Sequence, residues 1–142
     1  MLVSRREIRI EWGDCDPADI VYYPNYFAWF DGSLMWHFEQ AGLPKKQLLA
    51  RYDLVGWPMI ETRAVFHKPS TYGETVTIET GIAKFGRTSF EVEHKLMRGT
   101  ELAVEGFEKH VLVGRDPDAP GKMRSVPIPA EVIALFQGGT VD

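Results

Sequence analysis

The sequence predicts an α+β protein in which helices pack against one face of an antiparallel sheet. Three observations support this class. Segments 7–12, 75–82 and 89–96 alternate apolar and polar side chains with the period of two that strands show. A segment starting at Pro24 is apolar nearly all round at helical spacing, which is typical of a buried helix. Short breaks containing glycine separate the later strands, as expected between antiparallel neighbours.

The overall composition is that of an ordinary soluble globular protein. Its 142 residues suit one domain spanning 1–142, with 44% hydrophobic and 25% charged residues. The net charge of −4 provides no basic surface for nucleic acid or anionic lipid. We find neither a signal peptide at the N-terminus nor an apolar run of membrane-spanning length. We therefore expect a cytoplasmic protein with no nucleic-acid or membrane partner.

The cysteine and histidine content argues against a metal site. Cys15 is the only cysteine, so the chain has no internal disulfide and no cysteine cluster for zinc. The four histidines have no partner at metal-ligand spacing, and His94 falls on the apolar face of its strand, where we expect a hydrogen-bonded core residue. We therefore predict no metal ion.

The first strand and the long helix are predicted from periodicity and end signals. Glu7–Trp12 places its two isoleucines and its tryptophan on one face, which predicts a strand, and Gly13–Tyr23 follows as a loop. A helix should begin at Pro24, because proline lacks the N–H that a first helical residue leaves unpaired. Gly42 and Pro44 supply the stop signals.

Further elements are predicted downstream. A short second helix precedes four strands, which we expect to form a meander, and a small helix is expected near the C-terminus. The second helix is predicted at Pro44–Tyr52, the strands at Trp57–His67, Thr75–Ile82, Ser89–Leu96 and Leu102–Val113, the loop after them at Asp116–Gly121 and the last helix at Pro129–Phe136.

The loop before the long helix carries three carboxylates, Asp14, Asp16 and Asp19. Tyr23 is predicted at the N-cap and has no short side-chain oxygen to cap the first turn, so open N–H groups there would suit an oxyanion. Capping by water or a neighbouring loop is the alternative, and this feature alone favours it. Proline after Asp16 restricts that residue to an extended or turn conformation. A fixed carboxylate beside an oxyanion site is the pairing that acyl transfer needs. The spacing alone favours the alternative, a plain polar turn.

The stretch GDCDPADIVYYPNYFAWFD, Gly13–Asp31, resembles the signature of the 4-hydroxybenzoyl-CoA thioesterase family of the hotdog superfamily. The similarity covers nearly the whole chain, since the predicted element order also fits. The resemblance implies a hotdog fold, with an antiparallel sheet wrapped around one long central helix. It also implies hydrolysis of an aromatic acyl-CoA, such as 4-hydroxybenzoyl-CoA, to the free acid and CoA. No cofactor is expected, because coenzyme A is part of the substrate.

The resemblance assigns roles within the loop. Asp16 matches the catalytic aspartate, which attacks the thioester carbonyl as a nucleophile or activates a water as a general base. Tyr23 matches the residue whose backbone N–H polarises that carbonyl. Asp14 is either a supporting residue or a loop cap. Asp19 stands where the family often has glycine, which adds a negative charge near Asp16.

The resemblance also suggests substrate contacts. Asp31 matches a helix aspartate that reaches the phenol hydroxyl in aryl-CoA members; its alternative is a bond to a nearby group. Trp57 lines an aromatic acyl pocket or belongs to the core. Lys84 and Arg87 match the basic segment that meets the coenzyme A phosphates, with Arg124 as a weaker candidate. For each of these cations, a solvated surface position is the alternative.

Other functions remain open at the level of sequence. The close rival is a short-chain acyl-CoA or acyl-carrier-protein thioesterase, and a non-catalytic acyl-CoA binding module is the rival from another class. Hotdog subunits usually pair through sheet edges, so the resemblance implies a homodimer or a homotetramer.

Overall fold

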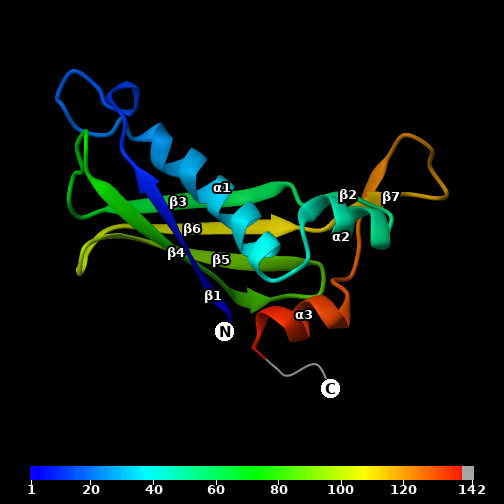
Figure 1. Ribbon diagram of the computed structural model, residues 1–142. Coiled ribbons are helices and arrows are strands. Elements are labelled where there is room, and N and C mark those ends of the chain that lie inside the picture. Colours follow the sequence, from blue (N-terminus) through cyan, green and yellow to red (C-terminus); the bar gives the residue numbers. More distant parts are fainter. Residues whose placement is uncertain (139–142) are drawn as a thin grey trace.

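A five-stranded antiparallel sheet forms the centre of the computed structural model, which describes residues 1–138 (Figure 1). The strand order is β1-β4-β5-β6-β3. The strands are β1 (Val3–Arg9), β3 (Met59–Phe66), β4 (Thr75–Phe85), β5 (Ser89–Arg98) and β6 (Glu101–Val111). The long helix α1 (Pro24–Gln40) crosses one face of this sheet (Figure 1). The α+β class is confirmed.

Short elements complete the fold. A second, three-stranded sheet has the order β2-β7-β8; helix α2 lies beside it in Figure 1, whereas α3 lies near the end of β4. These elements are β2 (Leu54–Gly56), β7 (Val113–Arg115), β8 (Met123–Ser125), α2 (Lys45–Arg51) and α3 (Ala130–Phe136), and a 3₁₀ turn, η1, covers Trp12–Asp14. None of the helices within residues 1–138 is both long and apolar enough to cross a membrane.

The expected four-strand meander is wrong for its first strand. Strands β4, β5 and β6 are sequential neighbours, but β3 pairs with β6 at the far edge and not with β4. The reason is that β1 occupies the other side of β4, with Val3 opposite Gly81 and Arg9 opposite Thr75. Both sides of β4 are therefore occupied, by β1 and β5, and β3 lies beside β6 instead.

Two predicted strand limits are also corrected. The first strand ends at Arg9 and not at Trp12, because the chain turns into η1 and leaves the Trp12 side chain 69% exposed. The strand predicted at Leu102–Val113 is two strands, β6 and β7, separated at Leu112. The predicted helix start at Pro24 and the Tyr23 N-cap are confirmed.

Helix α1 buries one face against the sheet. Phe30 and Leu34 are fully buried, and the Phe30 ring lies so close to Gly106 that a Cβ there would come within 2.5 Å of it. The expectation of a helix buried nearly all round is wrong for this chain, because Asp31 and Trp36 face solvent. The sheet therefore covers only the inner face of the helix.

A buried polar network lies between α1 and the sheet. Glu108 on β6 is 1% exposed, and its Oε2 lies 3.2 Å from Nε2 of both His94 and His110. His110 Nδ1–H donates to the Trp57 carbonyl oxygen at 2.9 Å, and Thr80 Oγ1 lies 2.8 Å from His94 Nδ1. The expected core position of His94 is confirmed. Burial alone would raise the pKa of Glu108, but the two histidines lower it to about 2.

His37 on α1 is a second buried ionisable group. Its Nδ1 lies 2.8 Å from Ser4 Oγ, while Nε2 has no hydrogen-bond partner within residues 1–138. Burial, with a smaller effect of His94, lowers the pKa of His37 from 6.5 to about 4. The imidazole is therefore neutral in the folded protein at neutral pH.

We expect acidification to destabilise the protein through His37. Because its folded pKa lies below the unfolded one, its contribution is complete above about pH 6.5 and is lost as the pH falls toward 4. The loss at pH 5 relative to pH 7.5 is about 2 kcal/mol. Urea unfolding of wild type and His37→Gln at the two pH values tests this, with exposed His67→Gln as the control. Equal pH dependence in wild type and His37→Gln would contradict it.

Candidate active site

The loop that carries Asp16 is a tight hairpin before α1. Cys15 and Val21 form an antiparallel bridge, and the Asp16 N–H donates to the Ile20 carbonyl oxygen at 2.9 Å. The Asp19 N–H donates back to the Asp16 carbonyl oxygen, also at 2.9 Å. These bonds give the loop a defined backbone and place Asp16 at the start of its turn.

The Asp16 side chain is held in place but keeps one oxygen available. Its Oδ1 accepts a hydrogen bond from the Ala18 N–H at 2.8 Å, which is an Asx turn. Its Oδ2 accepts no hydrogen bond from any described residue. The side chain is half-buried. A carboxylate that is oriented through one oxygen and open at the other suits attack on a carbonyl or on a water.

Tyr23 provides an unpaired donor beside this loop. It is the N-cap of α1 and makes no side-chain capping bond. Its backbone N–H donates no hydrogen bond within residues 1–138, and its side chain is 59% exposed. An N–H at a helix N-terminus carries part of the positive end of the helix dipole, so it suits a developing oxyanion. The structure thus brings the loop of Asp16 and the start of α1 together.

Two other side chains hold the arms of the hairpin. On the entering arm, the Asp14 carbonyl oxygen accepts Asn25 Nδ2–H at 2.8 Å and the Tyr22 N–H at 2.9 Å. On the leaving arm, Thr71 Oγ1–H donates to the Asp19 carbonyl oxygen at 2.6 Å. The Asp14 carboxylate itself caps η1, since its Oδ2 accepts the Glu11 N–H at 2.9 Å.

Asp19 occupies a backbone conformation that favours glycine. Its φ is 65°, in the left-handed region, where Asp and Asn are tolerated better than other non-glycine residues. Glycine, which the resemblance implies at this position, has this same freedom. The side chain of Asp19 is exposed, so the substitution for glycine preserves the turn.

We expect the stability of Asp19 variants to depend on how well the new residue tolerates a left-handed backbone conformation. Asp19→Val should lower the free energy of unfolding by about 1–2 kcal/mol, because a β-branched residue is strained at positive φ. Asp19→Gly should change it by less than about 1 kcal/mol, since relief of strain and greater unfolded-state entropy oppose each other. Urea unfolding curves measure both values. A Val variant as stable as the Gly variant would show that the left-handed turn is wrong.

A groove of about 340 Å³ borders the start of α1. It lies between the hairpin and helix on one side and the end of β3 on the other. The lining residues are Ile20, Val21, Tyr23, Tyr26, Phe66, His67, Lys68 and Pro69. Burial, partly offset by Ser70, raises the pKa of Tyr26 above its ordinary 10.0, so this phenol stays protonated. The volume and the largely apolar lining fit a small acyl group.

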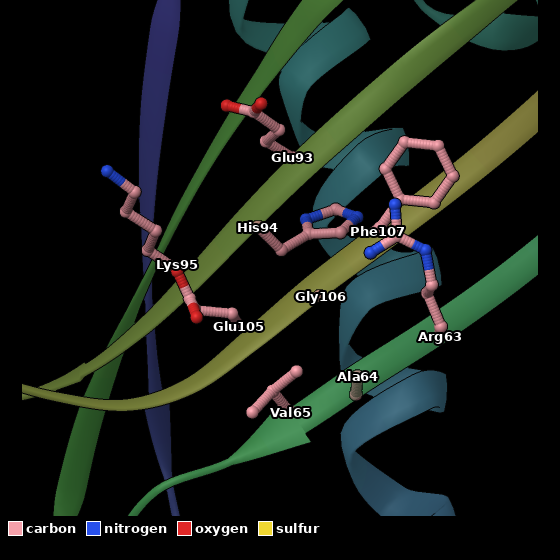
Figure 2. Close-up of a pocket in the computed structure, with 9 residues that line it drawn as sticks. All are labelled: Arg63, Ala64, Val65, Glu93, His94, Lys95, Glu105, Gly106 and Phe107. Atoms are coloured by element: carbon pink, nitrogen blue, oxygen red, sulfur yellow. The ribbon is translucent and has the colours of Figure 1, made fainter.

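A second hollow, of about 410 Å³, lies on the outer face of the sheet (Figure 2). Figure 2 shows the Arg63 guanidinium beside the Phe107 ring, whose centroid lies 4.0 Å from the guanidinium carbon. Glu93, Lys95 and Glu105 also line this hollow. Neither Asp16 nor any other residue of the hairpin borders it, so it is a charged outer surface separate from the candidate site.

The structure does not place Asp31 and Trp57 with Asp16 in one protomer. Asp31 is exposed and lies two turns along α1 from the helix start. Trp57 is 5% exposed and stacks on Phe38, with ring centroids 4.6 Å apart, so its surroundings are those of a core residue.

The two predicted phosphate contacts lie at the opposite end of the sheet from Asp16. The hairpin follows β1, whose Arg9 pairs with Thr75 at the start of β4, whereas Lys84 lies at the end of β4 and Arg87 in the turn after it. Eleven strand residues span roughly 35 Å. In Figure 1 the hairpin is at the upper left and the β4–β5 turn at the lower right.

Comparison with known proteins identifies the family. The model of the thioesterase-like superfamily matches residues 10–136. The chain belongs to the thioesterase-like superfamily. The match includes the hairpin and all of α1, so the residues that form the candidate site lie inside the part that defines this superfamily.

Relatives within the thioesterase-like superfamily include aryl-CoA thioesterases. The chain is 35% identical over 133 residues to 4-hydroxybenzoyl-CoA thioesterase of Pseudomonas sp. strain CBS-3, covering 89% of this chain and 92% of that one. A structure of an Asp-to-Asn mutant of 4-hydroxybenzoyl-CoA thioesterase complexed with 4-hydroxybenzoyl-CoA gives a TM-score of 0.84 at 34% identity, covering 94% and 98%. A gentisyl-coenzyme A thioesterase structure gives 0.79 at 28% identity, covering 94% and 99%. The hotdog fold expected from the sequence is confirmed.

Several residues of the candidate site were not predicted. Asn25 and Thr71 contact the hairpin, and Phe66 and Ile20 line the groove. The asparagine directly after a helix-starting proline was a visible signal, because its amide can reach a preceding loop. Thr71 lies 52 residues from Asp19, and no local pattern relates the two positions.

Proposed function

We propose that this protein hydrolyses aromatic acyl-CoA thioesters, with Asp16 as the catalytic carboxylate. The observation that carries the proposal is a hairpin that orients the Asp16 side chain and is hydrogen-bonded to the start of α1, where the Tyr23 N–H has no partner within residues 1–138. The relationship to 4-hydroxybenzoyl-CoA thioesterase supports the aromatic substrate class.

The proposed reaction uses these two groups on one carbonyl. The Tyr23 N–H binds the thioester oxygen and stabilises the negative charge that develops on it. Asp16 either attacks the carbonyl carbon, forming an anhydride and releasing the CoA thiolate, or removes a proton from a water that attacks it. In the first route water then hydrolyses the anhydride and regenerates the carboxylate. Both routes give the free acid and coenzyme A.

The groove beside Tyr23 is proposed as the acyl site. Its Phe66 and Tyr26 rings offer an aromatic surface, and its volume of about 340 Å³ leaves room for a benzoyl group. Since Asp31 is exposed on α1, its proposed contact with a phenol hydroxyl requires a second protomer to cover it.

The coenzyme A moiety is proposed to contact two protomers. Lys84 and Arg87 lie roughly 35 Å from the hairpin end of the same sheet, so they suit a coenzyme bound at the partner's Asp16. Guanidinium and ammonium groups are suitable donors to phosphate oxygens. This arrangement requires at least a homodimer.

The edge of β3 is the proposed dimer contact. Strand β3 pairs with β6 on one side and is unpaired on the other within the described sheet. Four of its apolar side chains are 42–57% exposed: Met59, Ile60, Val65 and Phe66. An unpaired apolar edge strand of this length favours pairing with a second copy.

Substitution on β3 is expected to dissociate the dimer. The double variant Ile60→Lys with Val65→Lys should weaken dimerisation at least about tenfold, because lysine blunts an edge strand. Thioester hydrolysis should fall with it, as the site is shared. Val3→Lys, on the β1 edge, is the matched control and should leave both unchanged. Sedimentation equilibrium and thiol-release assays measure the two effects; an unchanged mass in the double variant would refute the contact.

A panel of thioesters tests the function. Thiol release is followed with 4-hydroxybenzoyl-, benzoyl-, phenylacetyl-, butyryl- and palmitoyl-CoA. We expect the aryl substrates to be hydrolysed with the highest kcat/KM. Preference for butyryl-CoA would assign the short-chain activity instead. Absence of turnover combined with a higher melting temperature in coenzyme A would assign a binding module, since a ligand of the native state raises it.

A further inference from the structure

The Asp16 hairpin is held by side chains of two separate elements. Asn25, in the first turn of α1, donates to the Asp14 carbonyl oxygen at 2.8 Å. Thr71, in the connection between β3 and β4, donates to the Asp19 carbonyl oxygen at 2.6 Å. One bond lies two residues before Asp16 and the other three residues after it. The hairpin is therefore fixed on both arms.

The two bonds join the hairpin to the groups around it. Asn25 is two residues from Tyr23, so its bond sets where the entering arm lies relative to the Tyr23 N–H. Thr71 follows Ser70, whose carbonyl oxygen accepts the Val21 N–H at 2.9 Å. The Thr71 bond therefore fixes the leaving arm of the hairpin against the segment after β3, whose Pro69 lines the groove. The carbonyl of Asp19 belongs to the residue with a left-handed backbone in the turn of the hairpin.

We propose that Asn25 and Thr71 are positioning residues for thioester hydrolysis, which hold Asp16 at a fixed place relative to the Tyr23 N–H. This inference rests on the proposed function. Neither side chain needs to touch the substrate for this role. Small misplacements of a reacting group lower rates by up to about a hundredfold, so loss of either bond should act on the turnover rate.

The variants are chosen to remove the bond and keep the fold. Asn25→Asp is isosteric but replaces the donor with an oxygen, and a carboxylate in the first helical turn is favourable for the helix. Thr71→Val removes only the hydroxyl, while Thr71→Ser retains it. Gln40→Glu, the same amide-to-carboxylate change at the other end of α1, and Thr77→Val on β4 are the matched controls.

We expect Asn25→Asp and Thr71→Val to hydrolyse 4-hydroxybenzoyl-CoA with a turnover rate that is lower by a factor of about ten to a hundred, and with KM within about threefold of wild type. Thr71→Ser and the two control variants should turn over at the wild-type rate. The Ala18 amide, which donates to Asp16 Oδ1, should exchange with deuterium faster in the two impaired variants, while the amide of core Val92 should be unaffected.

The results that would refute the positioning role differ from those that would refute the proposed function. If Asn25→Asp and Thr71→Val keep the wild-type turnover rate within about twofold and Ala18 exchange is unchanged, while Asp16→Asn is inactive, the positioning role is wrong and the function stands. If Asp16→Asn is fully active, the proposed function is wrong, and the positioning role for this reaction fails with it. If Thr71→Ser is as impaired as Thr71→Val, the hydroxyl bond is not the cause and the role of Thr71 is refuted.

Discussion

Replacing Asp16 with asparagine is expected to slow turnover of 4-hydroxybenzoyl-CoA at least about a hundredfold. Asparagine has nearly the same shape and its side-chain oxygen can still accept the Ala18 N–H, so the Asx turn is preserved. What it lacks is the negative charge that attacks a carbonyl or removes a proton. Thiol release under saturating substrate measures the effect, and the melting temperature should change little.

Asp116 provides a matched control for this variant. Its Oδ1 accepts the Asp118 N–H at 2.9 Å, and a proline follows it, as Pro17 follows Asp16. Asp116→Asn therefore makes the same change in the same kind of turn, away from α1. Its turnover rate should equal that of wild type. Equal losses in both variants would show that turn chemistry, and not the Asp16 carboxylate, controls the rate.

Isotope labelling can distinguish the two roles proposed for Asp16, nucleophile and general base. In a single turnover in H₂¹⁸O, attack by Asp16 places one of its own oxygens in the acid product, because water then hydrolyses the anhydride at the Asp16 side. General-base catalysis delivers the solvent oxygen directly to the acid. Unlabelled acid in the first turnover, with the solvent oxygen found in the Asp16 side chain by mass spectrometry, therefore assigns the nucleophilic role.

Removing the buried carboxylate of Glu108 is expected to lower the free energy of unfolding by about 3–5 kcal/mol. Glu108→Leu removes the hydrogen-bond partner of His110 Nε2 and the carboxylate 3.2 Å from His94 Nε2, in a site that is nearly closed to solvent. His110 Nδ1 would keep its bond to the Trp57 carbonyl oxygen, but Nε2 would lose its acceptor. Urea unfolding at pH 7.5 measures the loss.

Glu105→Leu is the control for this variant. Glu105 lies on the same strand but on the outer face, where it contacts His67 at 2.9 Å in an exposed pair. Such pairs contribute about 1 kcal/mol or less. The Glu108 contribution also has a pH signature: because its folded pKa of about 2 lies below its unfolded value of 4.5, it is complete above about pH 4.5 and is lost as the pH falls toward 2. A Glu108 variant as stable as the Glu105 variant would contradict a structural role for the network.

The elements that could be predicted are those with local signals. Pro24 sets the start of α1 because its missing N–H suits that position, and Tyr23 is the N-cap for the same reason. Strands β4 and β5 alternate in sequence because one side faces the core and the other faces solvent. The chemistry of the Asp16 loop became specific only through the family resemblance, since Asp-Pro alone is a common turn.

The elements that were missed depend on contacts that a local pattern does not contain. The sequence predicts a strand at Trp57–His67 but does not say which strand it joins, so the position of β3 beside β6 could not be derived. Strands β2, β7 and β8 have three residues each, too few for a period to be recognised. Trp12 continues the alternation of β1 past the point where the backbone turns. The partners of the hairpin come from elsewhere in the chain.

The pairing of β1 with β4 determines when the protein can fold during synthesis. Val3 has its partner only after Gly81 has been made, and β3 waits for β6 in the same way. Until then the ribosome presents α1 with Phe30 and Leu34 uncovered, and pairings between such distant segments form slowly. The nascent chain therefore carries an apolar helix without its covering sheet until β6 has been made.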